Sequence, residues 1–572
     1  MLAVIRRWFQ QSSEGARVGV CGALAAMLYA LCSPYSNFAS AGFIDPWFYT
    51  GYFSNFTYLH RFAGVPYYVT RLAWILPGVV VFRIAGPETG SLILNAAMIA
   101  MSAISVYWIV RWSYGVFPAI LSAVVLAASP YFISTVAWDY PDGPAVAFLF
   151  VAIALYLRPG GNRAVNSVGG AVFLGLAGHT NMAAGPAIVG GLALLLLLRS
   201  RRSLSGLVRE GVWLGAGVAG VTILLALISR GVLHTYLFFM GQIGQTLYAI
   251  HNPTYLSGMW GTGNGFLRDA FRLVPPVFLL IAGGALLASR RKVRPVVLPL
   301  WVFLAVSAAV YAFEEFVLHG VALRVAYHSS YLVVPTFCLA GALFGELWPQ
   351  PTRTRVAAVA LLAALLVWAA AMPYAFAALR PALATGTAWL LLAGAGMSLI
   401  VALLLPWRNA VRVAIVAGMV FLLFTAYAVD GHIGYVWNRD NVRVFHALMD
   451  IQAHCNAAVP PDRPVRFWFD DKEPSGYTYT SAAALYIEGH DDLTGLLRAG
   501  NMKDFAYYAP VGTTLAHLAD RPETIVEHDR LLALRGVRVG ERKSWRITSG
   551  VAPFYLVFEN VVAMEGSGAV QR

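Results

Sequence analysis

Long apolar runs separated by short polar loops dominate the chain up to about residue 430. Runs long enough to cross the hydrocarbon layer, about 20 residues each, predict about thirteen membrane-spanning helices. The candidates are 18–34, 89–109, 115–135, 143–158, two within 167–198, 210–229, 272–288, 295–313, 329–347, 355–378, 386–405 and 411–430. The pattern therefore predicts a mainly α protein, a polytopic transmembrane helix bundle.

The pair of spans within 167–198 is short. About 32 residues enter and leave the membrane between basic residues at both ends, too few for two complete crossings at a rise of 1.5 Å per residue. A hairpin of short helices that turns at 178–186 satisfies this length. It would place His179 and Asn181 at membrane depth in a cavity, where broken helices are tolerated.

The pattern changes near residue 431, where charged residues become frequent and apolar runs shorten. Two segments, 465–469 and 554–558, have the composition of strands, and 441–454 has the periodicity of an amphipathic helix. We expect 431–572 to form a soluble C-terminal α/β domain of about 140 residues, within the usual domain size. Residues 1–430 would form the transmembrane domain, in which 35–88 is the first outward loop with juxtamembrane helices.

Composition and charge agree with an integral membrane protein and argue against nucleic acid. The 572 residues are 59% hydrophobic and only 12% charged, whereas soluble domains carry roughly a quarter charged residues. The net charge of +13 comes from short basic clusters between apolar runs, as in cytoplasmic loops. With the N-terminus inside, an odd number of spans places the C-terminal domain outside the cytoplasm. The four cysteines are scattered and predict neither a disulfide framework nor a zinc site.

The loop between the first two spans carries a lone carboxylate, Asp45, and two arginines, Arg61 and Arg71. An isolated charge near hydrocarbon is costly and tends to be functional, so one interpretation is a catalytic Asp45 with arginines that bind a lipid-linked phosphate. The other is an interfacial loop, in which aromatic residues form a membrane belt and Asp45 caps a short helix. The residues alone do not decide between the two. The aromatic residues include Trp47, Tyr49, Tyr67 and Tyr68.

A second outward turn, 136–143, carries two further acids. Pro141 and Gly143 favour a tight turn, so that both acids could face one cleft. Asp142 suits the N-cap of the following helix, which leaves Asp139 as the better functional candidate.

A third outward segment, 314–331, combines acidic and basic residues. Its two glutamates, Glu314 and Glu315, are typical of a solvated helix face. Arg324 and His328 are four positions apart and would share one face of a helix, where a cation could bind a lipid phosphate. No ligand spacing indicates a metal site, so the metal is unknown and a divalent cation stays an open alternative.

The order of these features resembles the GT-C superfamily of polytopic glycosyltransferases, especially the branch with the protein O-mannosyltransferases and the lipid A aminoarabinose transferase. Asp45 in FIDPWFYTGYF is similar to the acid of that family's first outward loop. The turn WDYPDG at 138–143 resembles its Pro-Asp turn, and GHTNMAAGP at 178–186 its hairpin with a polar turn; 327–345 loosely resembles the start of a late span. Asp45 is followed by Pro46 rather than by a second acid, and the hairpin lacks the lysine common there.

Sugar transfer from a lipid phosphate needs a base for the acceptor proton and positive charge for the departing phosphate. The resemblance implies an inverting glycosyltransferase that uses a polyprenyl-phosphate sugar donor and a glycan, lipid or protein acceptor at the outer face of the cytoplasmic (inner) membrane. The alternatives are a transporter or flippase of lipid-linked saccharides and a non-catalytic assembly partner with the GT-C fold. Asp45 is the expected base, and Asp139 is the expected second acid of the active site. The residues expected to bind the donor phosphate are Arg61, Arg71, Arg324 and His328. The residues expected to line the substrate site are Trp47, Tyr49, Tyr67, Tyr68, Asp142 and His179.

Overall fold

The computed structural model divides into two compact units. The first comprises Met1–Ser33, Thr70–Trp74 and Leu92–Gly434, and the second Pro34–Val69, Ile75–Ser91 and Tyr435–Arg572. The structure describes residues 12–33, 37–40, 44–63, 68–199, 204–252, 267, 270–288, 292–348, 394, 409–429, 438–459, 465–469, 497–498, 511–534 and 536–564. The predicted span 355–378, and the span 386–405 apart from residue 394, lie outside these ranges.

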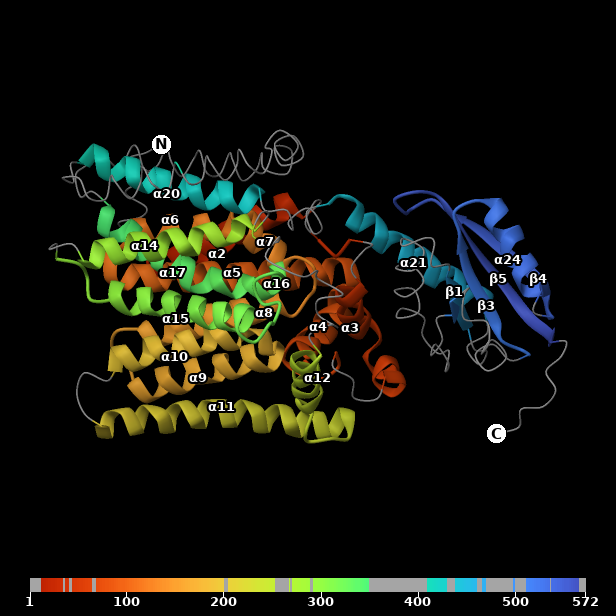
Figure 1. Cartoon of the computed structure of the whole chain (residues 1–572), viewed down its shortest axis with the longest axis horizontal. Coiled ribbons are helices and arrows are strands. Elements are labelled where there is room, and N and C mark those ends of the chain that lie inside the picture. The colour runs from red at the N-terminus through yellow and green to blue at the C-terminus, as the bar shows by residue number, and fades with distance from the viewer. Residues whose placement is uncertain are drawn as a thin grey trace. The chain divides into compact units, whose positions relative to one another are not determined.

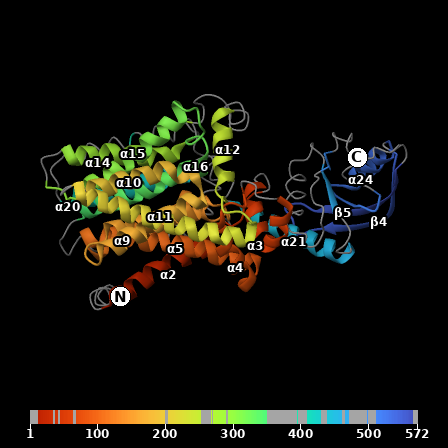
Figure 2. The ribbon, with the colours of Figure 1, turned by 90° about the horizontal axis from the view of Figure 1, so that it is seen from below.

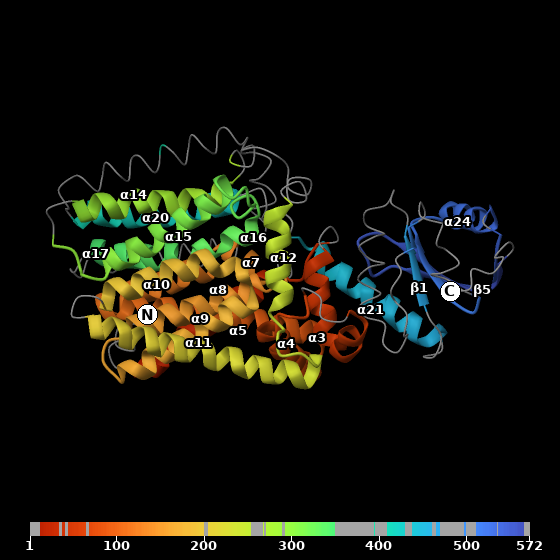
Figure 3. The ribbon, with the colours of Figure 1, turned by 60° about the horizontal axis from the view of Figure 1, so that its bottom comes forward.

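Most helices of the first unit run side by side in a bundle, and α12 (Met240–His251) runs across them (Figures 1 and 3). The other elements of this unit are α2 (Glu14–Cys32), α5 (Pro87–Tyr114, whose first turn belongs to the second unit), α6 (Val116–Ala127), α7 (Pro130–Val136), α8 (Asp142–Leu157), α9 (Arg163–Thr180), η1 (Met182–Ala184), α10 (Gly185–Arg199), α11 (Leu204–Leu233), η3 (Phe271–Leu273), α14 (Val274–Ala288), α15 (Val297–Phe316), α16 (Ala326–Ser329), η4 (Ser330–Leu332), α17 (Val333–Leu347) and α20 (Asn409–Val429).

Small residues allow close helix contacts in this bundle. Helix α9 packs between α8 and α11, and α10 packs on α15. A Cβ atom added to Gly190 of α10 would lie 2.1 Å from the Ser307 side chain of α15, and one added to Gly217 of α11 would lie 2.6 Å from the carbonyl oxygen of Val168 in α9. Small residues at helix contacts are typical of membrane proteins, where packing rather than the hydrophobic effect holds helices together.

Among the described residues, six helices are long and apolar enough to cross a membrane, or seven when α6 and α7 count as one bent span. This number is lower than the predicted thirteen, in part because two predicted spans lie outside the described ranges. Another, Asp142–Leu157, forms an apolar helix of fewer than 18 residues. The predicted span 115–135 is bent by 62° between α6 and α7, where Pro130 cannot continue the hydrogen-bond ladder of α6.

The predicted hairpin within 167–198 is present as α9 and α10. The two helices have 18 and 15 residues, which is short for membrane spans. They are separated at Asn181, whose backbone is extended (φ −154°, ψ 123°) and whose side chain accepts a hydrogen bond from the Ala183 backbone N–H. Asn181 therefore ends one helix and caps the short helix η1.

The second unit contains helices from the first loop and a mixed sheet. Its helices are α3 (Ile44–Ala63), most of α4 (Leu72–Ala85), α21 (Asp440–Ala458) and α24 (Pro522–Leu534). Its strands are β1 (Val465–Phe469), β2 (Leu497–Arg498), β3 (Thr514–Ala519), β4 (Val537–Ile547) and β5 (Phe554–Met564), in the order β2-β1-β3-β5-β4. Strand β1 is parallel to β2 and β3, whereas β5 is antiparallel to β3 and β4.

The sheet carries α24 beside β3 and β4 (Figures 1 and 2). Leu532 of this helix packs with Leu515, Val537 and Val561 of the strands in one apolar cluster. The predicted strands 465–469 and 554–558 and the predicted helix 441–454 are confirmed. The predicted fold class, a helical membrane bundle with an α/β part, is confirmed as well.

Candidate functional site

Asp45 is the second residue of α3 and lies in its first turn. Its side chain is half-buried, and its Oδ1 accepts a hydrogen bond of 2.9 Å from the Tyr68 hydroxyl. Because Asp45 lies inside the helix, it does not occupy the N-cap position that the interfacial-loop interpretation assigned to it. The carboxylate is oriented by a residue 23 positions away, which suits a positioned acid or base.

The Tyr68 ring, whose hydroxyl binds Asp45, belongs to a set of stacked aromatic rings in the second unit. Tyr68 stacks on Phe48 with ring centroids 4.6 Å apart and meets Tyr49 edge-on at 6.0 Å. Trp47 is fully buried and stacks against Phe38; among the described residues its indole N–H has no hydrogen-bond partner. These rings therefore form a rigid frame, and Trp47 and Tyr49 are largely inaccessible to a substrate.

Two predicted residues of the same loop cannot be placed at the level of their side chains. Arg61 belongs to α3, but its side chain lies outside the described part of the structure, and Tyr67 lies outside it entirely. Their predicted roles stay predictions.

The turn before α8 holds Asp139 and Asp142, both fully buried. Asp139 has a left-handed backbone (φ 57°), which is uncommon for a residue other than glycine and often occurs at functional sites. Its backbone carbonyl accepts a hydrogen bond of 3.1 Å from the Trp74 indole. Trp74 thereby holds a strained turn that presents the two acids.

Asp142 does not cap α8, so this part of the sequence analysis is wrong. It is the first residue of the helix, and no side-chain cap is formed there. Its Oδ1 instead accepts hydrogen bonds from Asn181 Nδ2 (2.8 Å) and from the Tyr331 hydroxyl (2.5 Å). Within the described residues its Oδ2 has no hydrogen-bond partner. A buried carboxylate oxygen in this state is costly unless a ligand or a charge compensates it.

Arg71 can supply the positive charge that compensates the buried Asp142 carboxylate. It is fully buried, and its charge interacts with the Asp142 carboxyl group and with the His328 ring. Its guanidinium carbon lies 5.8 Å from the ring centre of Tyr140. Arg71, Asp142 and His328 therefore form one cluster of ionisable side chains in the first unit.

An aromatic cluster adjoins Arg71. The rings of Trp138, Tyr140 and Tyr327 lie 4.9 to 5.5 Å from one another, and Tyr327 meets His328 edge-on at 4.7 Å. Aromatic faces suit both the guanidinium group and the apolar face of a sugar ring. The sequence analysis did not select Tyr140 or Tyr327, because only the fold brings the two turns together.

Arg324 and His328 do not share a helix face as predicted. Helix α16 begins at Ala326, so Arg324 precedes it in a turn. The Arg324 Nε donates a hydrogen bond of 2.6 Å to Glu315, and Glu315 is buried rather than part of a solvated face. The Glu315 carboxylate therefore compensates the Arg324 charge, and the phosphate-binding role of Arg324 stays a prediction.

Arg272 is a further buried cation that the sequence analysis missed. Its guanidinium donates to Ser329 Oγ (2.8 Å) and to the carbonyl oxygens of Leu323 (2.7 Å) and Arg324 (3.0 Å). It therefore holds the 323–329 turn, which carries His328. Arg272 precedes an apolar run in the sequence, where it reads as an ordinary loop residue.

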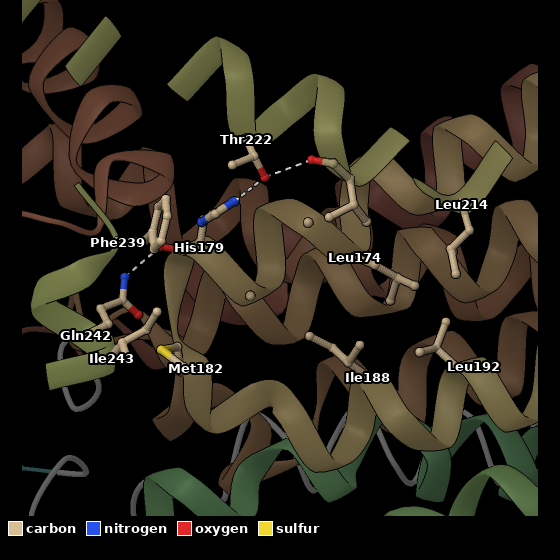
Figure 4. Close-up of a pocket in the computed structure, with 13 residues that line it drawn as sticks. Leu174, His179, Met182, Ile188, Leu192, Leu214, Thr222, Phe239, Gln242 and Ile243 are labelled. Atoms are coloured by element: carbon tan, nitrogen blue, oxygen red, sulfur yellow. Dashed lines mark hydrogen bonds between the residues drawn. The ribbon is translucent and has the colours of Figure 1, made fainter. Parts of the chain in front are cut away.

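His179 lines a mostly apolar cavity of about 340 Å³ between α9, α10, α11 and α12 (Figure 4). The predicted position of His179 in a cavity is therefore confirmed, whereas its role toward a substrate is untested. In the parts of the chain that the structure describes, no group of three or more His, Cys, Asp or Glu residues could hold a metal ion.

No protein-family model matches the chain, and no curated protein sequence matches it. Solved structures do resemble it. The crystal structure of ArnT from Cupriavidus metallidurans bound to undecaprenyl phosphate has a TM-score of 0.50 and 14% identity, and the match covers 95% of this chain and 98% of that one. The apo form of ArnT gives a TM-score of 0.50, 15% identity and coverages of 96% and 98%. The archaeal oligosaccharyltransferase AglB from Archaeoglobus fulgidus, in complex with an inhibitory peptide and a dolichol-phosphate, has a TM-score of 0.42 and 12% identity. That match covers 83% of this chain and 64% of AglB.

The chain thus has the fold of a solved transferase structure rather than a recognised sequence family. More particularly, it has the fold of ArnT over nearly its whole length. The predicted resemblance is confirmed at the level of the fold.

Proposed function

We propose that this protein is a glycosyltransferase that transfers a sugar from a polyprenyl-phosphate-linked donor to an acceptor hydroxyl. The observation that carries the proposal is the half-buried carboxylate of Asp45, which is oriented by the Tyr68 hydroxyl within a rigid aromatic frame. The ArnT fold supports it, because the matching ArnT structure holds undecaprenyl phosphate.

Asp45 acts as the general base in this proposal. Its Oδ2 accepts the proton of the acceptor hydroxyl while the acceptor oxygen attacks the anomeric carbon of the sugar. The bond from that carbon to the phosphate oxygen breaks, and its electron pair leaves with the polyprenyl phosphate. Attack from the face opposite the phosphate inverts the anomeric configuration. Tyr68 keeps Asp45 in one rotamer, which favours a single direction of proton transfer.

Positive charge must stabilise the departing phosphate. We assign this role first to Arg71, which is buried and accompanied by His328, and then to Arg61. Asp139 and Asp142 would position the acceptor or a divalent cation, since Asp142 has one carboxylate oxygen without a hydrogen-bond partner among the described residues.

The direct test is a transfer assay with the purified full-length chain and a polyprenyl-phosphate sugar. Catalysis predicts release of free polyprenyl phosphate with inversion at the anomeric carbon. A transporter or a non-catalytic assembly partner would bind the lipid and release none. Retention of the anomeric configuration would exclude Asp45 as the base of a single displacement.

The first prediction concerns Asp45→Asn. Asparagine preserves size and still accepts the hydrogen bond from Tyr68 but cannot take a proton, so we expect transfer to fall about 10²- to 10⁴-fold, the usual effect of losing a general base. Donor binding and folding should persist. The matched control is Asp440→Asn, because Asp440 occupies the first turn of α21 in the same unit. Near-normal transfer by Asp45→Asn would make Asp45 a structural residue.

A further inference from the structure

The cavity between α9, α10, α11 and α12 is lined almost entirely by apolar side chains, among them Leu174, Ile188 and Leu192 (Figure 4). Helix α11 turns apolar residues outward nearby: Ile223, Leu224 and Leu227 are 57–59% exposed. Exposed apolar side chains on a membrane-length helix face hydrocarbon, so the surroundings of this groove are lipid. Its volume of about 340 Å³ is at the lower end of the range for ligand sites, about 300–1,000 Å³. That size favours one hydrocarbon chain over a two-chain phospholipid.

One polar atom in this groove is unexplained by the fold. Gln242 of α12 is 2% exposed, and its Oε1 has no hydrogen-bond partner among the described residues. A buried amide oxygen in this state costs about 1–3 kcal/mol unless a ligand or water donates to it. The atom therefore needs a donor that the described protein does not supply.

The orientation of the Gln242 amide is fixed by its other end. Its Nε2 donates a hydrogen bond of 3.1 Å to the backbone carbonyl of His179, in the last turn of α9, where carbonyls lack helical partners. A flipped amide would place two acceptors against each other. Oε1 is therefore the unpartnered end of an amide that lines the groove, and it can only accept.

The His179 ring adds a second acceptor rather than a donor. Its Nε2 lies 2.7 Å from Thr222 Oγ1, and the Thr222 hydroxyl donates to the Val218 carbonyl at 2.8 Å. The Thr222 proton is thus in use, so the His179 Nε2 carries the proton of the neutral ring and donates it, which leaves Nδ1 as an acceptor. A phosphate diester, which offers only acceptors, would fit these atoms poorly.

Among the residues that the structure describes, no carboxylate lines the groove, so a buried ammonium group would lack a counter-charge there, which is costly in this environment. A hydroxyl group satisfies the acceptor without that cost. We propose that the groove binds a neutral, single-chain lipid alcohol, such as a prenol, whose hydroxyl donates a hydrogen bond to Gln242 Oε1. This site is separate in chemistry from the proposed donor-phosphate site, and it does not depend on the glycosyltransferase proposal.

The test compares two ligands that differ in a single donor. Purified full-length protein is photolabelled with a diazirine-bearing prenol, and farnesol and its methyl ether are compared as competitors. Labelled peptides should come from 174–192 and 214–243. Farnesol should compete about three- to tenfold better than the ether, as one neutral hydrogen bond contributes.

Gln242→Leu should abolish this preference and leave binding of the ether intact. Gln245→Leu is the matched control on the same helix, since Gln245 does not line the groove, and it should preserve the preference. Equal competition by farnesol and its ether in the wild-type protein would overturn the proposal, because water would then satisfy Oε1. Labelling outside the two segments would overturn it as well, and both of these outcomes are readable even if Gln242→Leu does not fold.

Discussion

At the scale of single residues, Asp142 illustrates what sequence reasoning can and cannot reach. Its place after Pro141 and before an apolar run predicted a helix cap, because capping depends only on the local chain. The hydrogen bonds that it forms in the structure come from Asn181 and Tyr331, 39 and 189 positions away. Such partners follow from packing and cannot be read from spacing. The local rule identified a polar residue that matters but assigned it the wrong partner.

The second prediction follows from that geometry. Asp142→Asn keeps one acceptor for Asn181 and Tyr331 but removes the charge, so the protein should fold and bind the donor. Transfer should fall about tenfold to over a hundredfold, the equivalent of about 1.5–3 kcal/mol for a hydrogen bond to a charged group. The initial rate of polyprenyl phosphate release measures this.

The control is Tyr331→Phe, which removes one donor and leaves the carboxylate in place. If Asp142 acts on a substrate or cation through Oδ2, Tyr331→Phe should reduce transfer much less than Asp142→Asn. If both variants reduce transfer equally and only slightly, and Asp142→Asn raises the melting temperature, the Asp142 carboxylate would instead be a buried charge that destabilises the fold and has no role in transfer.

At the scale of elements, periodicity located most helices and the clearest strands. The strand 465–469 and the break at Asn181 were predictable, because alternating apolar residues and a polar Gly- and Pro-bounded turn are local signals. The placement of Arg324 was not, because the helix begins only at Ala326 and the preceding turn is held by Glu315 and Arg272 from other elements. Element boundaries next to buried ion pairs depend on tertiary contacts.

The sheet contains a buried polar cluster of its own, and this cluster predicts that the stability of the sheet depends on pH. Glu559 of β5 is almost fully buried, and its side chain contacts His517 of β3 and Arg542 of β4. Burial alone would raise the pKa of Glu559, but hydrogen bonds and charge from His517 and Arg542 hold it below its usual range. Because the pKa is lower in the folded sheet, ionised Glu559 stabilises the fold at any pH above its pKa in the unfolded chain, about 4.3. This contribution disappears as the pH falls through the pKa of the folded state.

We therefore expect Glu559→Gln to lower the protection of β3 and β5 amides at neutral pH, with the difference from wild type shrinking below about pH 4. Hydrogen exchange with mass spectrometry on the full-length chain, expressed as protection factors, measures it segment by segment. Glu541→Gln is the control, because Glu541 is exposed on β4. A difference that stays constant down to pH 3, or an equal effect of Glu541→Gln, would contradict the assignment.

At the scale of the whole molecule, the order of features along the chain was more informative than any single motif. An acid after the first span, a Pro-Asp turn and a broken hairpin are each common, yet their sequence predicted the fold that ArnT shares over 95% of this chain. Order and spacing constrain topology strongly, because membrane spans can follow one another in few ways. The identity of the sugar and the acceptor depends instead on side chains from separate loops, and a shared fold carries little information about them.

The last prediction concerns the side of the membrane on which each part of the chain lies. All four cysteines are buried, so a single cysteine introduced on the surface can be labelled against a low background. Val551 of the second unit is 44% exposed, and Val165 at the start of α9 is 65% exposed. With basic clusters inside and an odd number of spans, the two positions should lie on opposite sides. In intact spheroplasts a membrane-impermeant maleimide should label Val551→Cys and should reach Val165→Cys only after permeabilisation. The reverse pattern, or labelling of both variants in intact cells, would overturn the parity of the spans and with it the outer location of the proposed active site.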